Sequence, residues 1–213
     1  MSEFANPILK THLNHLGHHI SIVYSTPYVY APVSSHPDIY LCKLGTDPAA
    51  PVLQCRPETL EMYYPGNIRY NAVCMGDYFI HNLAFTAQEL LEQARKAGKQ
   101  LISVKQGYTK CSMVVVNGNA AITSDPGIAS SLSETALDIL LVSHGHVRLK
   151  GHTYGFLGGT SGKVGDHLFF HGNLSVHPDF KKIRAFLEKH KCKFTYFKEF
   201  ELEDIGSIIE ALI

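Results

Sequence analysis

The feature that most constrains the fold of this chain is an internal repeat. Three stretches align on a turn glycine, and they read "NAVCMGDYFIHN" from residue 71, "SMVVVNGNAAITS" from 112 and "GTSGKVGDHLFFH" from 159. In each stretch a short strand-like run is followed by Gly-Asp or Gly-Asn and then by a second strand-like run. Because a tight hairpin turn needs positive φ, such pairs between apolar runs are typical of β-hairpins. The repeat therefore predicts three hairpins.

A helix-like segment and a short apolar strand follow each predicted hairpin. In the first unit, Thr86 and Glu89 have the spacing of a capping box at the start of the helix. The closing strands of the three units read "QLISV", "DILLV" and "KFTYF". The repeating unit is therefore ββαβ, with helices predicted over 86–98, 126–136 and 177–191.

Two partial units would complete a ring. The segment "HPDIYLCKLGTD" from residue 36 places Gly45 at the equivalent turn, and the weakly helical "PETLEMYY" follows it. Near the N-terminus "ILKTHLNHLGHHISIVYS" supplies a helix and a strand, and residues 204–213 supply a missing first strand. Sharing one unit between the two chain ends would leave no exposed sheet edge. We therefore expect a single α/β domain over residues 1–213, a five-bladed α/β propeller closed by pairing of the N- and C-terminal segments in one blade.

This arrangement resembles the pentein fold. That is the fold of the guanidine-modifying enzymes (arginine deiminases, dimethylarginine hydrolases and amidinotransferases) and of the archaeal and eukaryotic ribosome anti-association factor. More narrowly, "HPDIYL", "YPGNIRYNAV", "KQGYTKCS", "YGFLGGTSG" and "DIGSII" are similar to a bacterial family assigned to that fold for which no activity is established. This match spans about residues 30 to 213. The resemblance implies the architecture above and, from the enzymes, cysteine chemistry on an amidine or amide C–N bond.

Composition excludes several classes of partner. The 19 basic and 19 acidic side chains give a formal net charge of zero, so the chain has no electrostatic footprint for nucleic acid or an anionic membrane. The N-terminal residues lack the pattern of a signal peptide, which predicts a cytoplasmic protein. The five cysteines are widely spaced and form no CxxC pair, which argues against disulfides and a zinc ribbon. Cys42 and Cys74 lie within strand-like runs and Cys192 ends a predicted helix, so we expect these three to be small buried residues. We expect a small-molecule substrate, no nucleic acid and no membrane as partners.

Thirteen histidines raise the question of a metal site. His12, His15 and His19 have helical spacing but no acidic partner, and His144 and His146 are only a pair. Because neither set supplies three or four convergent ligands, we expect no metal, although the number of histidines keeps that alternative open. The glycine-rich "GFLGGTSG" from residue 155 lacks the lysine of a P-loop, so we expect no cofactor either.

The residues before the first strand of each unit would surround the axis of such a propeller. All five segments are polar, unlike the usual start of a buried strand, and together they predict a lined site. They read His36-Pro37-Asp38, Tyr70-Asn71, Lys110-Cys111-Ser112, Gly159-Thr160-Ser161 and Asp204-Ile205-Gly206-Ser207.

Cys111 is the candidate nucleophile. Lys110 beside it and Lys105 upstream would lower the pKa of the thiol and so favour the reactive thiolate. The competing interpretation is a buried apolar thiol at the start of a strand, because alternation places Cys111, Met113 and Val115 on one face. One departure from the guanidine-modifying enzymes weakens the comparison. Those enzymes carry their cysteine in the last unit, where this chain has Ser207.

His36 is the candidate general acid or base, because its ordinary pKa is near neutral pH. Asp38 would face the same side of an extended segment and orient the His36 ring or bind a cation, unless it merely caps its own backbone. The tripeptide His-Pro-Asp occurs again at 177–179, where a helix start explains it. No local capping argument explains the first copy.

The remaining candidates would bind substrate. Asp204 could pair with a guanidinium or amino group, or it could belong to a solvated acidic turn. Glycines in "GFLGGTSG" would let backbone amides point at developing negative charge. The predicted substrate-binding side chains are Asp204, Asn71, Lys110, Ser161, Ser207 and Asn67.

Two functions follow from these residues. The first is a cysteine-dependent hydrolase or transferase in which Cys111 attacks an amidine-like carbon and His36 moves protons. The second is a non-catalytic ligand-binding or interaction module, because the fold also supports that role. The enzyme requires the Cys111 sulfur and a His36 nitrogen to lie close together beside an open pocket. A binding module would instead present a broad apolar or charged face.

Overall fold

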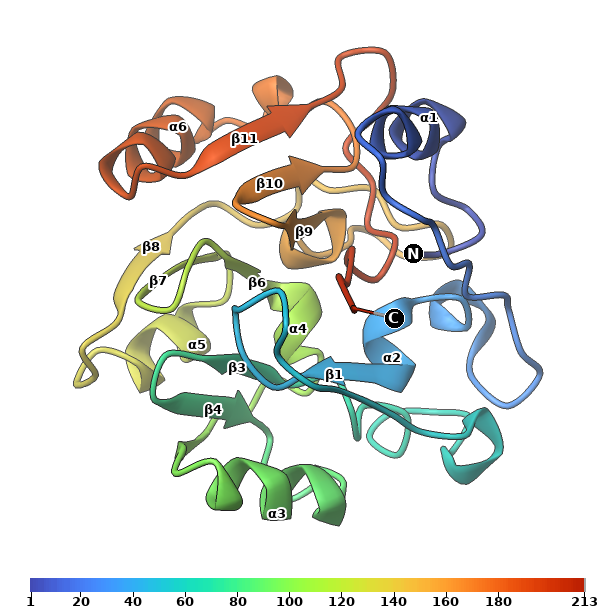
Figure 1. Cartoon of the computed structure of the whole chain (residues 1–213), viewed down its shortest axis with the longest axis vertical. Coiled ribbons are helices and arrows are strands. Elements are labelled where there is room, and N and C mark those ends of the chain that lie inside the picture. The colour runs from blue at the N-terminus through green and yellow to red at the C-terminus, as the bar shows by residue number, and fades with distance from the viewer. Residues whose placement is uncertain (213) are drawn as a thin grey trace.

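All three predicted hairpins form, and each is part of a three-stranded sheet (Figure 1). The computed structural model describes residues 1–212. In each sheet the first two strands pair antiparallel, and the third strand lies parallel to the second. The strands are β3 (Val73–Met75), β4 (Tyr78–His81) and β5 (Gln100–Ser103); β6 (Met113–Val115), β7 (Ala120–Thr123) and β8 (Asp138–Leu141); and β9 (Ser161–Val164), β10 (His167–Phe170) and β11 (Lys193–Tyr196).

A helix joins the second and third strands of each unit, because a parallel pair needs a crossover connection. These helices are α3 (Gln88–Lys96), α5 (Pro126–Ser131) and α6 (Phe180–Lys189). The predicted capping box of α3 is wrong. Ala87 is the N-cap residue of that helix, and the Thr86 hydroxyl lies 2.7 Å from His81 Nδ1 instead.

The fourth sheet holds only β1 (Leu41–Lys43) and β2 (Val52–Gln54), which pair antiparallel across the loop that contains Gly45. The weakly helical segment after it forms the 3₁₀ turn η2 (Pro57–Thr59). The remaining elements are short and irregularly placed. They are α1 (Pro7–His15), α2 (Pro37–Tyr40), α4 (Thr109–Ser112), η1 (Ala31–Val33), η3 (Gly158–Thr160) and η4 (Leu174–Val176).

The two chain ends meet in one hydrophobic cluster. Leu9 and Leu13 of α1 pack with Phe169 of β10 and with Ile205 and Ile208 near the C-terminus. The C-terminal segment follows η3 and β9, because Ser207 N donates to Gly159 O at 2.8 Å and Ile208 N to Ser161 O at 2.9 Å.

The predicted strand pairing between the chain ends is not seen. Within residues 1–212 no hydrogen-bonded strand joins the N-terminal segment to the C-terminal one. The predicted C-terminal strand, 204–212, runs as irregular chain, and residue 213 lies outside the described residues. The molecule is thus a mixed α/β protein built from small sheets, with the chain ends joined by packing.

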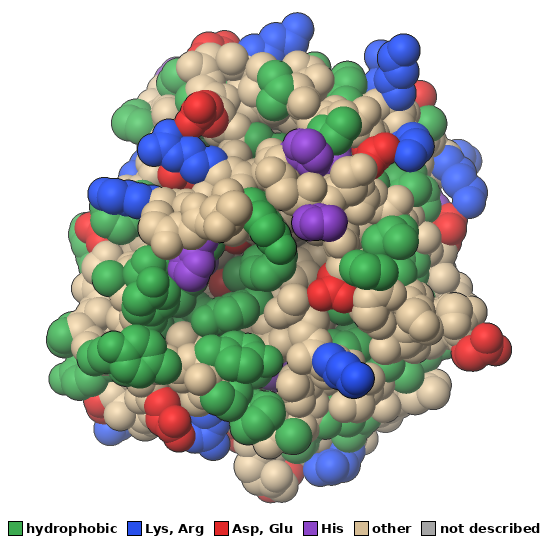
Figure 2. All heavy atoms as spheres, turned by 180° about the vertical axis from the view of Figure 1, so that it is seen from behind, with side chains coloured by type: hydrophobic (Ala, Val, Ile, Leu, Met, Phe, Trp, Pro, Cys, Tyr) green, Lys and Arg blue, Asp and Glu red, His purple; other side chains and the backbone are tan. Residues whose placement is uncertain are grey.

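Exposed aromatic side chains gather on one face. Figure 2 shows hydrophobic side chains in the lower left of the face turned away from the viewer in Figure 1, beside a hollow that a histidine borders. Five exposed large hydrophobic residues come from two loops that contact each other between Tyr30 and Tyr63, namely Tyr28, Tyr30, Met62, Tyr63 and Tyr64.

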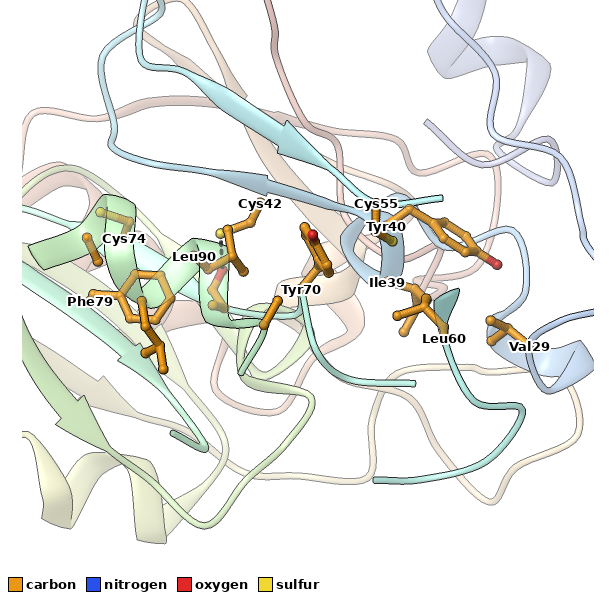
Figure 3. Packing of buried hydrophobic residues seen from close by; sticks show 14 of the residues in the cluster. Val29, Ile39, Tyr40, Cys42, Cys55, Leu60, Tyr70, Cys74, Phe79 and Leu90 are labelled. Carbon is orange, nitrogen blue, oxygen red and sulfur yellow. Dashed lines mark hydrogen bonds between the residues drawn. The ribbon is translucent and has the colours of Figure 1, made fainter. Parts of the chain in front are cut away.

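The largest core cluster packs around β1, α2 and the first complete unit (Figure 3). Cys42 of β1 and Cys74 of β3 are buried in it, which confirms their interpretation as small core residues. Cys55 is buried in the same cluster, and burial raises the pKa of its thiol to about 12. Cys192 differs from the prediction because it follows the end of α6 and is only partly buried. These four thiols are therefore core or peripheral residues.

None of the helices within residues 1–212 combines the length and the apolar character needed to cross a membrane.

Candidate functional site

Three segments far apart in the sequence meet at Asp38. The thiol of Cys111, from α4, donates a hydrogen bond to Asp38 Oδ2 at 3.0 Å. The hydroxyl of Ser207 donates to the same oxygen at 2.7 Å. Lys110 Nζ in turn donates to Ser207 Oγ at 3.0 Å. The result is a continuous chain of donors in which one carboxylate oxygen accepts from both a thiol and a hydroxyl.

Asn71 fixes the backbone that carries the thiol. Its Oδ1 accepts from Lys110 N at 2.8 Å and from Cys111 N at 3.2 Å, and its Nδ2 lies 3.4 Å from Cys111 Sγ. Asn71 is fully buried, so this amide replaces water for two backbone donors. A predicted substrate-binding residue therefore holds α4 in place.

Three of the five polar segments that were expected at strand starts adopt short helical turns instead, namely α2, α4 and η3. Cys111 lies within α4, and β6 begins only at Met113. The prediction that strand alternation aligns Cys111 with Met113 and Val115 is therefore wrong. Asp38 likewise lies in α2, before β1.

The two His-Pro-Asp copies are more alike than predicted, because both precede a helical segment. Pro37 occupies the first helical position of α2, and His36 is its N-cap residue. In the second copy α6 starts at Phe180, three residues after the predicted start at 177, and Asp179 accepts from Ser143 N at 2.7 Å. What separates the copies is the partner of the aspartate, because only Asp38 contacts a thiol.

His36 and Asp204 form the second part of the site. His36 Nδ1 lies 3.8 Å from Asp204 Oδ1, which is too long for a direct hydrogen bond. Asp204 accepts from Phe156 N and Gly206 N, each at 2.9 Å. Phe156 N, one of the amides in residues 155–162 that were predicted to face developing charge, therefore binds a carboxylate instead.

Two buried polar atoms at the site have no hydrogen-bond partner among the described residues. They are His36 Nδ1 and Asp38 Oδ1. Buried polar groups are normally satisfied, so such atoms need an explanation. One ring nitrogen of His36, one oxygen of Asp38 and Cys111 Sγ also lie within 4.8 Å of one another. The site therefore concentrates unsatisfied acceptors beside a thiol.

A pocket of about 290 Å³ opens beside this cluster. Its deepest lining residues are buried: His36 is 3% exposed, Cys111 2% and Asp204 4%. Asp38 is fully buried and does not itself line the pocket. The geometry that the enzyme hypothesis requires, a histidine nitrogen near the cysteine sulfur beside a pocket, is therefore present.

Burial sets the protonation of these groups. Burial, followed by the charges of Asp38 and Asp204, raises the pKa of Cys111 well above its ordinary value. The predicted lowering by neighbouring lysines is wrong for this state, because Lys105 is exposed and Lys110 donates to Ser207 instead. Burial also lowers the pKa of Lys110, against the attraction of Asp38. The resting cysteine is thus a thiol.

The histidine and the carboxylates are also perturbed by burial. Desolvation lowers the pKa of His36 to about 4, with Asp38 opposing the shift. It raises the pKa of Asp204 to about 6, although hydrogen bonds from Phe156 N and Gly206 N oppose it. The pKa of Asp38 is raised as well, mainly by desolvation. At neutral pH the site therefore pairs a neutral imidazole with a mostly ionised Asp204.

Two predicted residues lie elsewhere. Ser161 donates to Gly158 O at 3.0 Å and lines a separate cavity of about 70 Å³, which Lys110 also lines. Asn67 is buried, and its Oδ1 accepts from the Tyr108 hydroxyl at 3.2 Å. Asn67 therefore supports a wall of the pocket rather than lining it.

Sequence reasoning missed the residues that form the wall. Tyr108, Phe156 and His152 line the pocket, but each is an ordinary residue in an irregular segment. Tyr108 is the N-cap residue of α4 and lies three positions before Cys111. This closeness in sequence was the one signal that could have placed Tyr108 at the pocket.

A metal ion could use His36, Asp38 and Cys111, which offer one nitrogen, one oxygen and one sulfur. These donor types suit zinc, whose sites are usually tetrahedral. These three residues include none of the histidines that the sequence suggested as possible metal ligands. In this structure the thiol and the carboxylate are hydrogen-bonded to each other.

The fold and the site together define a mixed α/β protein with a buried cysteine–aspartate–histidine cluster at the base of a pocket. Residues 51–209 match the Family of unknown function (DUF6873), and the chain belongs to that family. No curated protein and no solved structure matches the chain. Cys111, Asp204 and Ser207 lie inside the matched range, whereas His36 and Asp38 precede it.

Proposed function

We propose that the chain is a five-bladed propeller of the pentein type. Three complete ββαβ units, a fourth two-stranded sheet and the packing of both chain ends in one cluster support this arrangement. In the proposed architecture the α1 region and the segment from Asp204 form the fifth blade by packing rather than by strand pairing. A crystal structure with five sheets or sheet equivalents around one axis would test it.

We further propose that the chain is a cysteine-dependent enzyme that hydrolyses an amidine-type C–N bond. The observation that carries this proposal is the Cys111 thiol bonded to Asp38 Oδ2 at 3.0 Å, with a His36 nitrogen nearby, at a pocket. A thiol beside a proton acceptor and a histidine satisfies the basic requirement for an activated nucleophile.

Recognition of a planar cation follows from the other side of the pocket. An amidinium NH₂ group can donate to both His36 Nδ1 and Asp204 Oδ1, which lie 3.8 Å apart. Neutral His36 accepts such a bond, and ionised Asp204 supplies the charge. A bound cation would also offset the negative charges that hold the thiol proton on Cys111.

The proposed reaction balances with water as the only co-reactant. The thiol proton moves to Asp38 Oδ2, the sulfur forms a bond to the amidinium carbon, and the C=N π electrons move to nitrogen. That proton is then delivered to the leaving nitrogen, and the C–N bond breaks with its electrons on the amine. Water next adds to the carbon while His36 takes its proton. The C–S bond then breaks with its electrons on sulfur, and His36 returns its proton to the sulfur to restore the thiol. The hydroxyl proton is lost to solvent as the C=O bond forms, which releases an amide product and leaves the departed amine as its ammonium ion.

The test compares two small alkylating agents of nearly equal shape. Chloroacetamidine carries the cationic head, and chloroacetamide is its neutral counterpart. We expect the cationic reagent to modify Cys111 faster, by roughly tenfold or more relative to the neutral reagent, as mapped by mass spectrometry. Asp204→Asn should remove that preference.

Cys192 provides the internal control, because it is partly exposed and far from the pocket lining. The ratio of the alkylation rates of Cys192 with the two reagents measures their relative intrinsic reactivity. An equal rate ratio at Cys111 and Cys192 in the folded protein would overturn the proposed cation recognition.

A non-catalytic binding module is the second candidate. The raised pKa of Cys111 favours it, because a protonated, buried thiol is a poor nucleophile. If neither reagent modifies Cys111 until the protein is unfolded, while amidines still bind in the pocket, this second function is the correct one.

A further inference from the structure

The wall of the pocket differs chemically from its base. Tyr108 and Phe156 line it with ring centroids 6.4 Å apart and planes inclined by 33°. Tyr64 continues this surface, with its centroid 5.8 Å from that of Tyr108. The pocket thus offers a polar, acidic base and an adjoining aromatic surface (Figure 2).

The rings of the wall are held in position. The Tyr108 hydroxyl donates to the buried amide of Asn67 at 3.2 Å, which fixes the ring against its neighbours. Phe156 is anchored through its own backbone, because its N–H donates to Asp204 Oδ2 at 2.9 Å. The same residue therefore links the aromatic wall to the carboxylate at the base. Phe156 and Asp204 both line the pocket, so a ligand bound at the carboxylate has this ring nearby.

No fixed positive charge faces the pocket. Among the described residues that line it there is no lysine and no arginine. Lys110, close to the site in sequence and space, is bonded to Ser207 and lines the separate cavity instead. A carboxylate on the body of a ligand would find no cationic partner here and would face the negative charge of Asp204.

Volume limits the size of the ligand. A pocket of about 290 Å³ holds roughly ten non-hydrogen atoms, if each takes about the 30 Å³ of one water molecule. That is the size of one aromatic ring bearing one amidine group. Larger ligands would extend onto the exposed aromatic surface around Tyr63 and Tyr64.

We propose that the ligand of this pocket is an aryl amidinium or aryl guanidinium without a carboxylate. Its cationic head lies at His36 and Asp204, and its uncharged ring packs on Tyr108 and Phe156. The inference rests on the cation recognition proposed above, and it adds that the rest of the ligand is an uncharged aromatic ring. Offset contacts between aromatic rings supply affinity and orientation beyond simple burial.

The test is calorimetric titration of the intact protein with four probes. Benzamidine carries head and ring, acetamidine the head alone, benzamide the ring with a neutral head, and 4-amidinobenzoate adds a carboxylate. We expect benzamidine to bind at least about tenfold more tightly than each of the other three.

Variants separate the two parts of the pocket. Phe156→Leu keeps apolar bulk but removes the ring. It should weaken the binding of benzamidine while leaving the affinity for acetamidine unchanged. Tyr108→Phe keeps the ring but loses the bond that fixes it to Asn67, so it should weaken the binding of benzamidine by less than Phe156→Leu does. Asp204→Asn should weaken both amidines, and thermal unfolding of each variant checks that it is folded.

The outcomes distinguish failure of this inference from failure of the proposed function. Equal affinities for acetamidine and benzamidine, or equal affinities for 4-amidinobenzoate and benzamidine, would overturn the aryl class while the cation site stands. Equal affinities for benzamide and benzamidine, unaffected by Asp204→Asn, would overturn the cation site itself. Absence of binding by all four probes would overturn both.

Discussion

Asp38 determines what the Cys111 thiol can do at the scale of single residues. Its Oδ2 accepts the thiol proton, and its charge is the largest cause after burial for the raised pKa of Cys111. The same carboxylate is therefore both the proton acceptor of the proposed reaction and, after burial, the main cause that keeps Cys111 protonated in the unliganded protein. A cation in the pocket would shift that balance.

Replacing Asp38 by asparagine should lower the pKa of Cys111, because the neutral amide no longer disfavours a nearby thiolate. Each unit by which the pKa falls increases the thiolate fraction about tenfold at a pH below that pKa. We expect Cys111 in Asp38→Asn to react faster with iodoacetamide at pH 8 than in the wild type. The rate at Cys192 should not change. A slower or unchanged rate at Cys111 in a folded variant would contradict this role.

The residues of the site were predictable, but their protonation was not. The repeat predicted that Asp38, Cys111 and Ser207 would lie close together, because each precedes a strand that was expected at an equivalent position. The direction of the Cys111 pKa depends on burial and on the carboxylates that face it, and both are properties of the assembled chain. Lys110 is adjacent in sequence, yet its amine points to Ser207.

At the scale of elements, hairpins were predicted correctly because their signal is local. A Gly-Asp or Gly-Asn pair between apolar runs specifies the turn regardless of its surroundings. The short turns α2 and α4 were missed because four residues carry no helical periodicity. Their geometry comes from packing, as when Asn71 binds two backbone amides of α4.

The C-terminal segment is held against α2 by close backbone approach. Gly206 has a φ of +71°, and a Cβ atom there would collide with the Cβ and ring of His36. In addition, Asp38 N donates to Gly206 O at 3.2 Å. Glycine is therefore needed at this position for both conformation and space.

Gly206→Ala should destabilise the protein more than Gly98→Ala. Gly98 has nearly the same φ, +70°, but an added Cβ there meets nothing within 4 Å. The control therefore carries only the backbone cost of about 1 kcal/mol, whereas Gly206→Ala adds an overpacking cost of about 1–3 kcal/mol. Urea unfolding measures both free energies. Equal losses would mean that the segment can move away from α2 without cost.

At the scale of the whole molecule, His171 joins the two ends of the chain. Its Nε2 accepts from Asn6 N at 2.9 Å, and its Nδ1 donates to Glu203 O at 3.0 Å. The bond from Asn6 N requires the neutral ring, because a protonated Nε2 cannot accept a hydrogen bond. Burial lowers the pKa of His171 to about 4, whereas an unfolded histidine has a pKa near 6.5. Below pH 6.5 the unfolded chain therefore binds the proton more readily, and stability falls as the pH decreases toward 4.

His171→Gln should remove this pH dependence, because a glutamine amide can accept and donate without titrating. We expect the free energy of unfolding of the variant, relative to the wild type, to rise by about 2 kcal/mol between pH 7 and pH 4.5. Comparing the two proteins cancels the opposing contributions of Asp38 and Asp204, whose pKa values are raised. If the difference in the free energy of unfolding between the two proteins does not change with pH, His171 does not join the chain ends in the way proposed here.

The hydrogen bonds of the site span long stretches of chain. Cys111 and Asp38 are 73 positions apart, and Ser207 and Asp38 are 169 apart. Contacts of such separation form late, because large loops must close first. During synthesis a growing chain that has not yet reached residue 204 already contains Cys111 but neither Asp204 nor Ser207. Its cysteine can meet Asp38 and His36 but lacks the carboxylate that would bind the proposed cation, so the complete set of site residues exists only after residue 207 has been added.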